Sequence, residues 1–209
     1  MKTLKLNYIF PFFIFLSLPS CFADQDFSKV TVAQSQNSIE LENVKLVDAI
    51  KSSNKDLFLE ALSNGANPSY KISPDSNVLS LAAVNLDSFF LQALLENGGD
   101  PNIYRASARR SLIFEVLGPD RREHLKILLK FKPCIAVRDG VDNTPLIYAA
   151  ILSNYKSMNL LMNNGANTVN ENKYGYSVLD VLEDNETREC QPSSCQELQN
   201  IKSVISKNK

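Results

Sequence analysis

Apolar residues along the chain fall into stretches that recur about every 33 positions. Each stretch begins at one apolar anchor, and a second anchor follows 15 residues later. The anchor pairs are Leu46 and Ala61, Leu79 and Leu94, Ile113 and Leu128, and Leu146 and Leu161. A pattern that returns in phase in this way is typical of repeat architectures. It predicts helix pairs near residues 44–64, 77–97, 111–131 and 144–163, followed by a capping pair near 177–184 and 196–206.

A polar turn motif separates the predicted pairs. The sequence SNGANP at residues 63–68 returns as ENGGDP at 96–101 and as NNGANT at 163–168. Gly165 can adopt the left-handed conformation that ends a helix. The copy at residues 128–134 has Lys132, Pro133 and Cys134 in place of the glycine and its neighbours. We therefore expect an irregular turn there.

The best copy of the repeat reads DNTPLIYAA at residues 142–150. Thr144 is well placed as a helix N-cap, and Pro145 suits the first helical position because no hydrogen bond is lost there. This sequence resembles the ankyrin repeat, whose pattern runs T-P-L-H-x-A-A and then L-L-x-x-G-A-D/N. The resemblance covers residues 44–206. The histidine of that pattern is replaced by Ser80, Phe114 and Ile147, so its capping hydrogen bonds must be supplied otherwise.

The resemblance implies an all-α solenoid. Its domain spans residues 41–206, with four helix-turn-helix repeats at about 44–76, 77–110, 111–143 and 144–176 and a C-terminal capping repeat at 177–206. A single helix pair cannot bury its apolar side, so stacking of neighbours must build the core.

The N-terminus has the features of a secretory signal at residues 1–23. Lys2 and Lys5 precede a short apolar run that is too short to span a membrane comfortably. We expect cleavage after Ala23 and a periplasmic location, with residues 24–40 as a flexible leader to the array. The alternatives are lipidation at Cys21, which ends a lipobox-like segment and would tether the protein to a membrane, and an uncleaved anchor.

Three cysteines follow the predicted cleavage site. Cys190 and Cys195 bracket a short turn-forming segment and are expected to form a disulfide in an oxidising compartment. Cys134 is expected to be a buried thiol. A metal site is the rival interpretation, but no second cysteine pair or neighbouring histidine completes a tetrahedral set.

Composition and charge narrow the chemistry. The 209 residues carry a formal net charge of −1 with a pI near 5.9, which argues against nucleic acid as the partner. His124 is the only histidine, and we expect a partly exposed helix residue without a catalytic role. Asp180 with Glu183 or Asp184 falls on one helical face, a common arrangement on solvated helices. We expect a non-enzyme without catalytic residues, cofactor, metal or small-molecule substrate.

Recognition of another protein is the expected activity. The resemblance implies that a partner meets the hairpin tips and the exposed side of the first helices, on the concave face. Carrying that pattern over, repeat by repeat, gives these candidate contacts: Ser76, Val84, Asn85, Tyr104, Arg105, Arg110, Val141, Asn143, Ile151, Leu152, Lys173, Tyr174 and Tyr176. Arg109, Arg121 and Arg122 are added because they cluster with Arg105 and Arg110 in or beside the third repeat.

Two features of this surface are distinctive. The five arginines lie in or beside the third repeat and could form a cationic patch, or simply a solvated face. Tyr174 and Tyr176, with Ile151 and Leu152, could form an exposed aromatic-aliphatic strip, or could pack under the capping repeat.

The resemblance favours a small, exported ankyrin-repeat protein of bacterial type that binds another protein in the periplasm or envelope. An immunity or inhibitor protein that occludes a secreted toxin is the favoured role, because a stoichiometric inhibitor needs only a preformed surface. The alternatives are an accessory protein for an envelope or antioxidant enzyme, an effector directed to a host cell, and a hydrolase that uses Asp or Ser groups.

Overall fold

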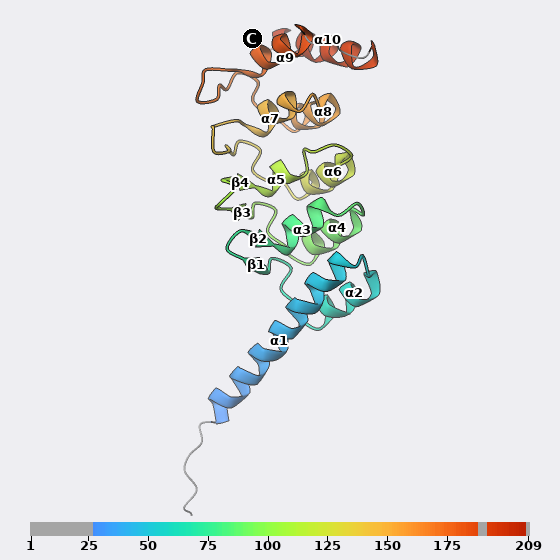
Figure 1. The fold of residues 1–209 in the computed structure, drawn as a ribbon, viewed down its shortest axis with the longest axis vertical. Helices are drawn as coiled ribbons and strands as arrows, with labels where there is room; N and C mark the ends of the chain where they lie inside the picture. Colours follow the sequence, from blue (N-terminus) through green and yellow to red (C-terminus); the bar gives the residue numbers. More distant parts are fainter. Residues whose placement is uncertain (1–26, 188–191, 208–209) are drawn as a thin grey trace, which may run out of the picture.

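The described part of the protein is a stack of five helix pairs. The computed structural model describes residues 27–187 and 192–207. The first helices of the pairs lie above one another, with the hairpin tips on one side and the second helices on the other (Figure 1). The pairs are α1 Phe27–Lys51 with α2 Lys55–Ser63, α3 Val78–Val84 with α4 Phe89–Glu96, α5 Leu112–Glu115 with α6 Arg122–Lys130, α7 Pro145–Ile151 with α8 Tyr155–Asn163, and α9 Val178–Thr187 with α10 Pro192–Lys207.

Two hairpin tips contain short antiparallel strands. β1 Lys71–Ser73 pairs with β2 Ser76–Asn77 between the first and second helix pairs. β3 Tyr104–Arg105 pairs with β4 Arg110–Ser111 between the second and third. The structure is therefore predominantly helical, as expected.

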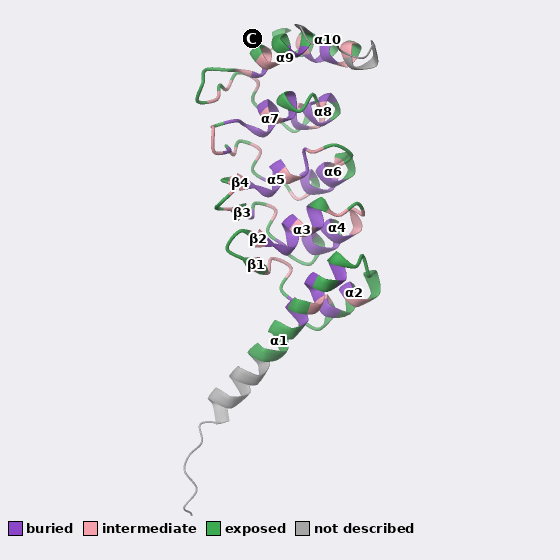
Figure 2. Cartoon of the chain, in the orientation of Figure 1, coloured by how far each residue is buried: buried purple, intermediate pink, exposed green. Residues whose placement is uncertain are grey.

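The core runs continuously through the stack. The eight predicted anchor residues are all buried, none with more than 1% of its surface exposed. They belong to one cluster that extends from α1 to α10 (Figure 2). Because each pair supplies only part of this cluster, its apolar surface is hidden by the pairs above and below it. The prediction of a shared core built by stacking is confirmed.

The predicted start of α7 is also confirmed. The Thr144 side chain accepts a hydrogen bond from the backbone N–H of Ile147 at 3.2 Å, and Pro145 occupies the first turn. Asn77 caps α3 in the same manner at 2.8 Å. Ser111, at the equivalent place before α5, makes no such bond. This difference accompanies the shortness of α5, which ends at Glu115.

The turns after the second helices are more alike than the sequence indicates. Gly65, Gly98 and Gly165 have φ values of +93°, +88° and +87°. Lys132, at the corresponding place, has φ of +51° and so keeps the left-handed conformation. The prediction of an irregular turn is therefore wrong for the backbone at Lys132. One hydrogen bond of the turn is nevertheless lost, because Pro133 has no N–H to donate.

Side chains tie each pair to the one before it. Asn85, Asn154 and Asn185 donate to the carbonyls of Ile50, Leu117 and Ala150, at 3.0, 3.1 and 2.8 Å. In the third pair Arg121 has this role. Its guanidinium donates to the carbonyls of Val84 and Asn85, at 2.6 and 3.0 Å. These bonds give carbonyls at or just after the ends of the first helices a partner in the next pair. The carbonyls of Ile50 and Ala150 also accept from the backbone N–H groups of Ser53 and Ser153, at 3.2 and 2.9 Å.

One N-terminal segment differs from expectation, and another is not described. The flexible leader predicted at residues 24–40 is helical from Phe27 onward, as the first part of α1. Residues 27–43 contain no glycine or proline, so nothing in the sequence interrupts the helix. The predicted signal at residues 1–23 lies outside the described residues. No helix in the described part is long and apolar enough to cross a membrane.

The cysteines also require a correction. Cys134 is a free and exposed thiol rather than a buried one, because it lies in the surface turn that follows Pro133. Cys195 in α10 is disulfide-bonded. Cys190 lies outside the described residues, so its pairing with Cys195 stays a prediction.

Candidate binding face

The side of the stack formed by the first helices and the hairpin tips carries most of the predicted contact residues. Six of them are large apolar or aromatic side chains that are between 42% and 64% exposed: Val84, Tyr104, Ile151, Leu152, Tyr174 and Tyr176. Leu86, which the sequence analysis did not select, is 86% exposed in the turn after α3. Tyr174 and Tyr176 are therefore not packed under the last helix pair, which was the alternative interpretation.

Three of the five arginines are engaged within the molecule. The Arg105 Nη1 atom lies 2.8 Å from Glu115 Oε1. Arg121 bonds backbone carbonyls of the preceding pair, as described above. Arg110 lies on the ring of Tyr148, with its guanidinium carbon 4.5 Å from the ring centroid, and donates to the Tyr148 hydroxyl at 2.9 Å.

Arg109 and Arg122 are exposed. The Arg109 side chain lies over Gly140 of the next hairpin tip. A Cβ atom added to Gly140 would be 3.4 Å from the Cδ atom of Arg109. The structure thus uses much of the arginine cluster to hold the third pair and its hairpin in place. The predicted cationic patch therefore has two exposed arginines, Arg109 and Arg122, and three whose guanidinium groups bind other parts of the protein.

The remaining predicted contacts vary in exposure. Asn143 is only 4% exposed, donates to Asp139 Oδ2 at 3.1 Å and accepts from the Asn172 side chain at 2.9 Å. Asn143 therefore holds two hairpin tips together instead of offering an exposed contact, which corrects its selection. Ser76, Asn85 and Val141 are half-buried. Lys173 is exposed, with its ammonium nitrogen 5.0 Å from the centroid of the Tyr174 ring.

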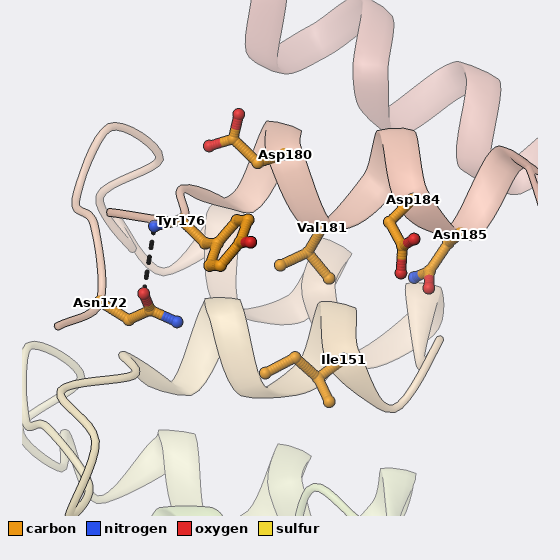
Figure 3. Close-up of a pocket in the computed structure, with 7 residues that line it drawn as sticks. All are labelled: Ile151, Asn172, Tyr176, Asp180, Val181, Asp184 and Asn185. Carbon is orange, nitrogen blue, oxygen red and sulfur yellow. Dashed lines mark hydrogen bonds between the residues drawn. The ribbon is translucent and has the colours of Figure 1, made fainter. Parts of the chain in front are cut away.

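An open hollow of about 400 Å³ lies between α7 and α9. Figure 3 shows the Tyr176 ring, Val181 and Ile151 around the gap between the two helices, with Asp184 and Asn185 at one end and Asn172 at the other. Asn172 accepts a hydrogen bond from the backbone N–H of Tyr176 at 3.1 Å, which fixes the loop that carries the ring. Of the predicted contacts, the hollow brings together Ile151 and Tyr176.

The other lining residues were not selected from the sequence. They are Asn172, Asp180, Val181, Asp184 and Asn185. A signal for two of them was present, because Asp180 and Asp184 are four positions apart and so share one side of a helix. The sequence analysis grouped Ile151 with Tyr176 on the exposed face, but nothing in the sequence indicated that Ile151 lies opposite Val181 of α9.

His124 is not the partly exposed residue that the sequence suggested. It is 2% exposed in α6, and neither ring nitrogen has a hydrogen-bond partner among the described residues. Burial, and then the positive charge of Arg121, lower the pKa of His124. The Asn85 carbonyl and the Asp87 carboxylate partly oppose this, although the carbonyl completes no hydrogen bond of good geometry.

The described residues contain no group of three or more His, Cys, Asp or Glu side chains that could hold a metal ion. The hydroxyl of Ser157 is buried without a partner in α8. It occupies in the fourth pair the position that His124 has in the third, eight residues before the left-handed turn residue.

The face formed by the first helices and the hairpin tips offers exposed apolar and aromatic side chains with charged side chains beside them.

Comparison with known proteins gives two matches. The Ankyrin repeat family model matches residues 142–173. A mitochondrial disaggregase from Bos taurus is 26% identical over 156 residues, which cover 69% of this chain and 22% of that protein. The chain thus spans about a fifth of the length of this curated relative. Residues 142–173, which contain α7 and α8, are thus similar to an ankyrin repeat.

Proposed function

We propose that this chain is an exported, non-catalytic module that binds another protein, and that it acts as an immunity or inhibitor protein against a secreted toxin. In this proposal the helix pairs are four ankyrin repeats and a C-terminal capping repeat. The observation that carries it is the row of exposed apolar and aromatic side chains on one side of a rigid stack. Contiguous exposed apolar groups with polar borders mark sites of protein association.

Inhibition is favoured over catalysis for a physical reason. Occlusion of a toxin needs a preformed surface that loses little conformational entropy on binding. The stack offers such a surface, because its turns are fixed by left-handed residues and its pairs by cross-pair hydrogen bonds. An accessory role for an envelope or antioxidant enzyme would use the same row of exposed apolar and aromatic side chains. That role is our second candidate.

The test is co-purification from the native host. The protein, tagged at its C-terminus, is recovered from the periplasmic and membrane fractions, and the bound proteins are identified. A toxin-like enzyme whose activity falls to background at a 1:1 ratio would support inhibition. An envelope or antioxidant enzyme whose activity rises would favour the accessory role. Recovery of the tagged protein alone from all fractions would contradict both.

Export has a separate test. Intact-mass measurement of the recovered protein should show a chain that begins at Asp24. A diacylated or triacylated chain beginning at Cys21 would support the lipoprotein alternative instead. A chain that retains residues 1–23 in the cytoplasmic fraction would contradict export.

A further inference from the structure

Three turns of the stack contain an asparagine followed by a glycine. The asparagine is in each case the C-cap of a second helix, at residues 64, 97 and 164. Asparagine is chemically labile, and a following glycine favours loss of ammonia because no Cβ hinders attack of the glycine nitrogen on the asparagine side chain. The three equivalent turns can therefore be compared within one molecule.

In all three turns the glycine nitrogen is engaged. Each glycine N–H donates to the helix carbonyl three residues before it: Gly65 to Leu62 at 3.1 Å, Gly98 to Leu95 at 3.1 Å and Gly165 to Met162 at 2.9 Å. A nitrogen held in this way does not attack, so the reaction requires the turn to open locally. The turn that is held most weakly should thus react first.

In two of the turns the asparagine side chain is tied to its own helix. Asn97 donates from its side-chain amide to the Ala93 carbonyl at 2.8 Å. Asn164 donates in the same way to the Leu160 carbonyl, also at 2.8 Å. These bonds must break before either side chain can turn toward the glycine nitrogen.

The first turn lacks this bond. The equivalent carbonyl, that of Glu60, accepts instead from the hydroxyl of Ser63 at 2.8 Å. The Asn64 amide is left with a contact of 3.4 Å to Glu42 Oε2 in α1, which is longer than the usual range of about 2.7–3.2 Å. Asn64 is therefore held less tightly than its two counterparts.

The position of the first turn adds to this difference. The pair of α1 and α2 lies at one end of the described stack (Figure 1). A terminal unit of such an array has a neighbour on one side only, and so it opens at a lower cost than an internal unit.

We propose that Asn64 is a deamidation site, the first of the three to react, and that its product weakens the attachment of α1 to the turn after α2. The Gly65 nitrogen loses its proton to hydroxide and bonds to Cγ of Asn64. The bond from Cγ to Nδ2 breaks, and the nitrogen takes a proton from water and leaves as ammonia. Water then opens the five-membered imide at either carbonyl, which gives aspartate or isoaspartate without oxidation or reduction.

The product changes the contact with α1. Glu42 is 8% exposed. The hydrogen bond from Lys45 lowers the pKa of Glu42, the bond from Asn64 adds to this, and burial opposes both. A carboxylate at position 64 cannot donate that bond and places a second negative charge beside Glu42. Isoaspartate would also lengthen the backbone of a turn in which the Ala66 N–H donates to the Ala61 carbonyl at 3.0 Å.

The main test needs no variant. The purified protein is incubated at mildly alkaline pH, and samples are digested at acidic pH, where the reaction is slow. Mass spectrometry measures the deamidated fraction at positions 64, 97 and 164 over time. We expect Asn64 to react about threefold to tenfold faster than either of the others, the factor that one hydrogen bond contributes to an equilibrium. No reaction at Asn64, equal rates at the three sites, or a faster reaction at another of them would overturn the proposal.

Two variants exchange the residue before the asparagine. Ser63→Asn frees the Glu60 carbonyl for the Asn64 amide and should slow the reaction at Asn64 by about threefold. Asn163→Ser places a hydroxyl at the equivalent position and should accelerate the reaction at Asn164 by a similar factor. Asn97 is the internal control and should react at the same rate throughout. Unchanged rates at positions 64 and 164 would show that Ser63 does not select the site.

Two further variants test the effect of the product. Asn64→Asp and Asn97→Asp both place a carboxylate at a helix C-terminus, which is unfavourable, but only position 64 contacts Glu42. Hydrogen exchange of the α1 amides should be at least about threefold faster in Asn64→Asp than in Asn97→Asp. Equal exchange in α1 would refute the proposed weakening of its attachment.

Discussion

Replacement of His124 by leucine should stabilise the protein and remove part of its sensitivity to acid. Position 124 is 2% exposed, and its counterparts in the first and second pairs are Leu57 and Phe90. The imidazole buries two nitrogen atoms that have no partner among the described residues. A buried polar group without a partner costs about 1–3 kcal/mol. We therefore expect His124→Leu to raise the free energy of unfolding by about 1–3 kcal/mol at pH 7.5.

The pH dependence has a definite sign. Burial lowers the pKa of His124 in the folded protein below its ordinary value of 6.5. Between the folded pKa and 6.5, the unfolded chain binds a proton that the folded chain does not. Stability from this residue is thus fully present above pH 6.5 and is lost as the pH falls toward the folded pKa. The loss is at most about 1.4 kcal/mol per pH unit.

Urea denaturation followed by circular dichroism, at several pH values between 4.5 and 7.5, measures this effect. Carboxylates such as Glu42, whose pKa is lowered by its hydrogen bond to Lys45, also cost stability in acid. The difference between the unmodified protein and His124→Leu isolates the histidine from them. The advantage of the variant should grow as the pH falls below 6.5. An advantage that shrinks in acid, or a variant less stable at every pH, would refute the reasoning.

Three further substitutions, two of them with a control substitution, have expected results in the same assay. Lys132→Gly should stabilise by about 0.5–1 kcal/mol, because relief of the left-handed conformation exceeds the extra flexibility of the unfolded chain. Lys130→Gly, at the last residue of α6, should instead destabilise by up to about 1 kcal/mol, and equal effects would contradict this account. Thr144→Ala should cost about 1 kcal/mol, whereas Ser111→Ala, which removes no capping bond, should cost clearly less; a reversed order would be inconsistent with the caps. Asn185→Ala should cost about 0.5–1.5 kcal/mol, because it removes one hydrogen bond to the Ala150 carbonyl, which still accepts from the Ser153 backbone N–H at 2.9 Å; an unchanged stability would contradict a stabilising role for this cross-pair bond.

The sequence predicted the stacked arrangement because the requirement for burial recurs at fixed intervals. Leu79 and Leu94 lie 15 residues apart for the same reason as Leu146 and Leu161, so one copy explains the others. The same register, if applied to His124, would have predicted its burial. Its neighbours in the sequence are charged, and they suggested an exposed residue instead.

Features that depend on contact between distant residues could not be predicted. Arg110 was assigned to a cationic patch, but its ring contact with Tyr148 joins residues 38 positions apart. The hollow requires Ile151 of α7 to face Val181 of α9, and no local pattern specifies that orientation. The length of α1 was missed because a polar composition resembles that of a leader segment, although residues 27–43 contain no glycine or proline that would break a helix.

The cross-pair bonds of Asn85, Arg121, Asn154 and Asn185 all point in one direction, from a later helix pair to an earlier one. During synthesis, each pair would leave the ribosome before the side chain that completes its carbonyl end. Each helix pair would then gain its last hydrogen bonds only after the next pair had been synthesised and had packed against it. Removal of the last helix pair by proteolysis would take away the side chain that bonds the carbonyl of the fourth pair. Removal of the first pair would leave the carbonyl bonds of the second pair in place.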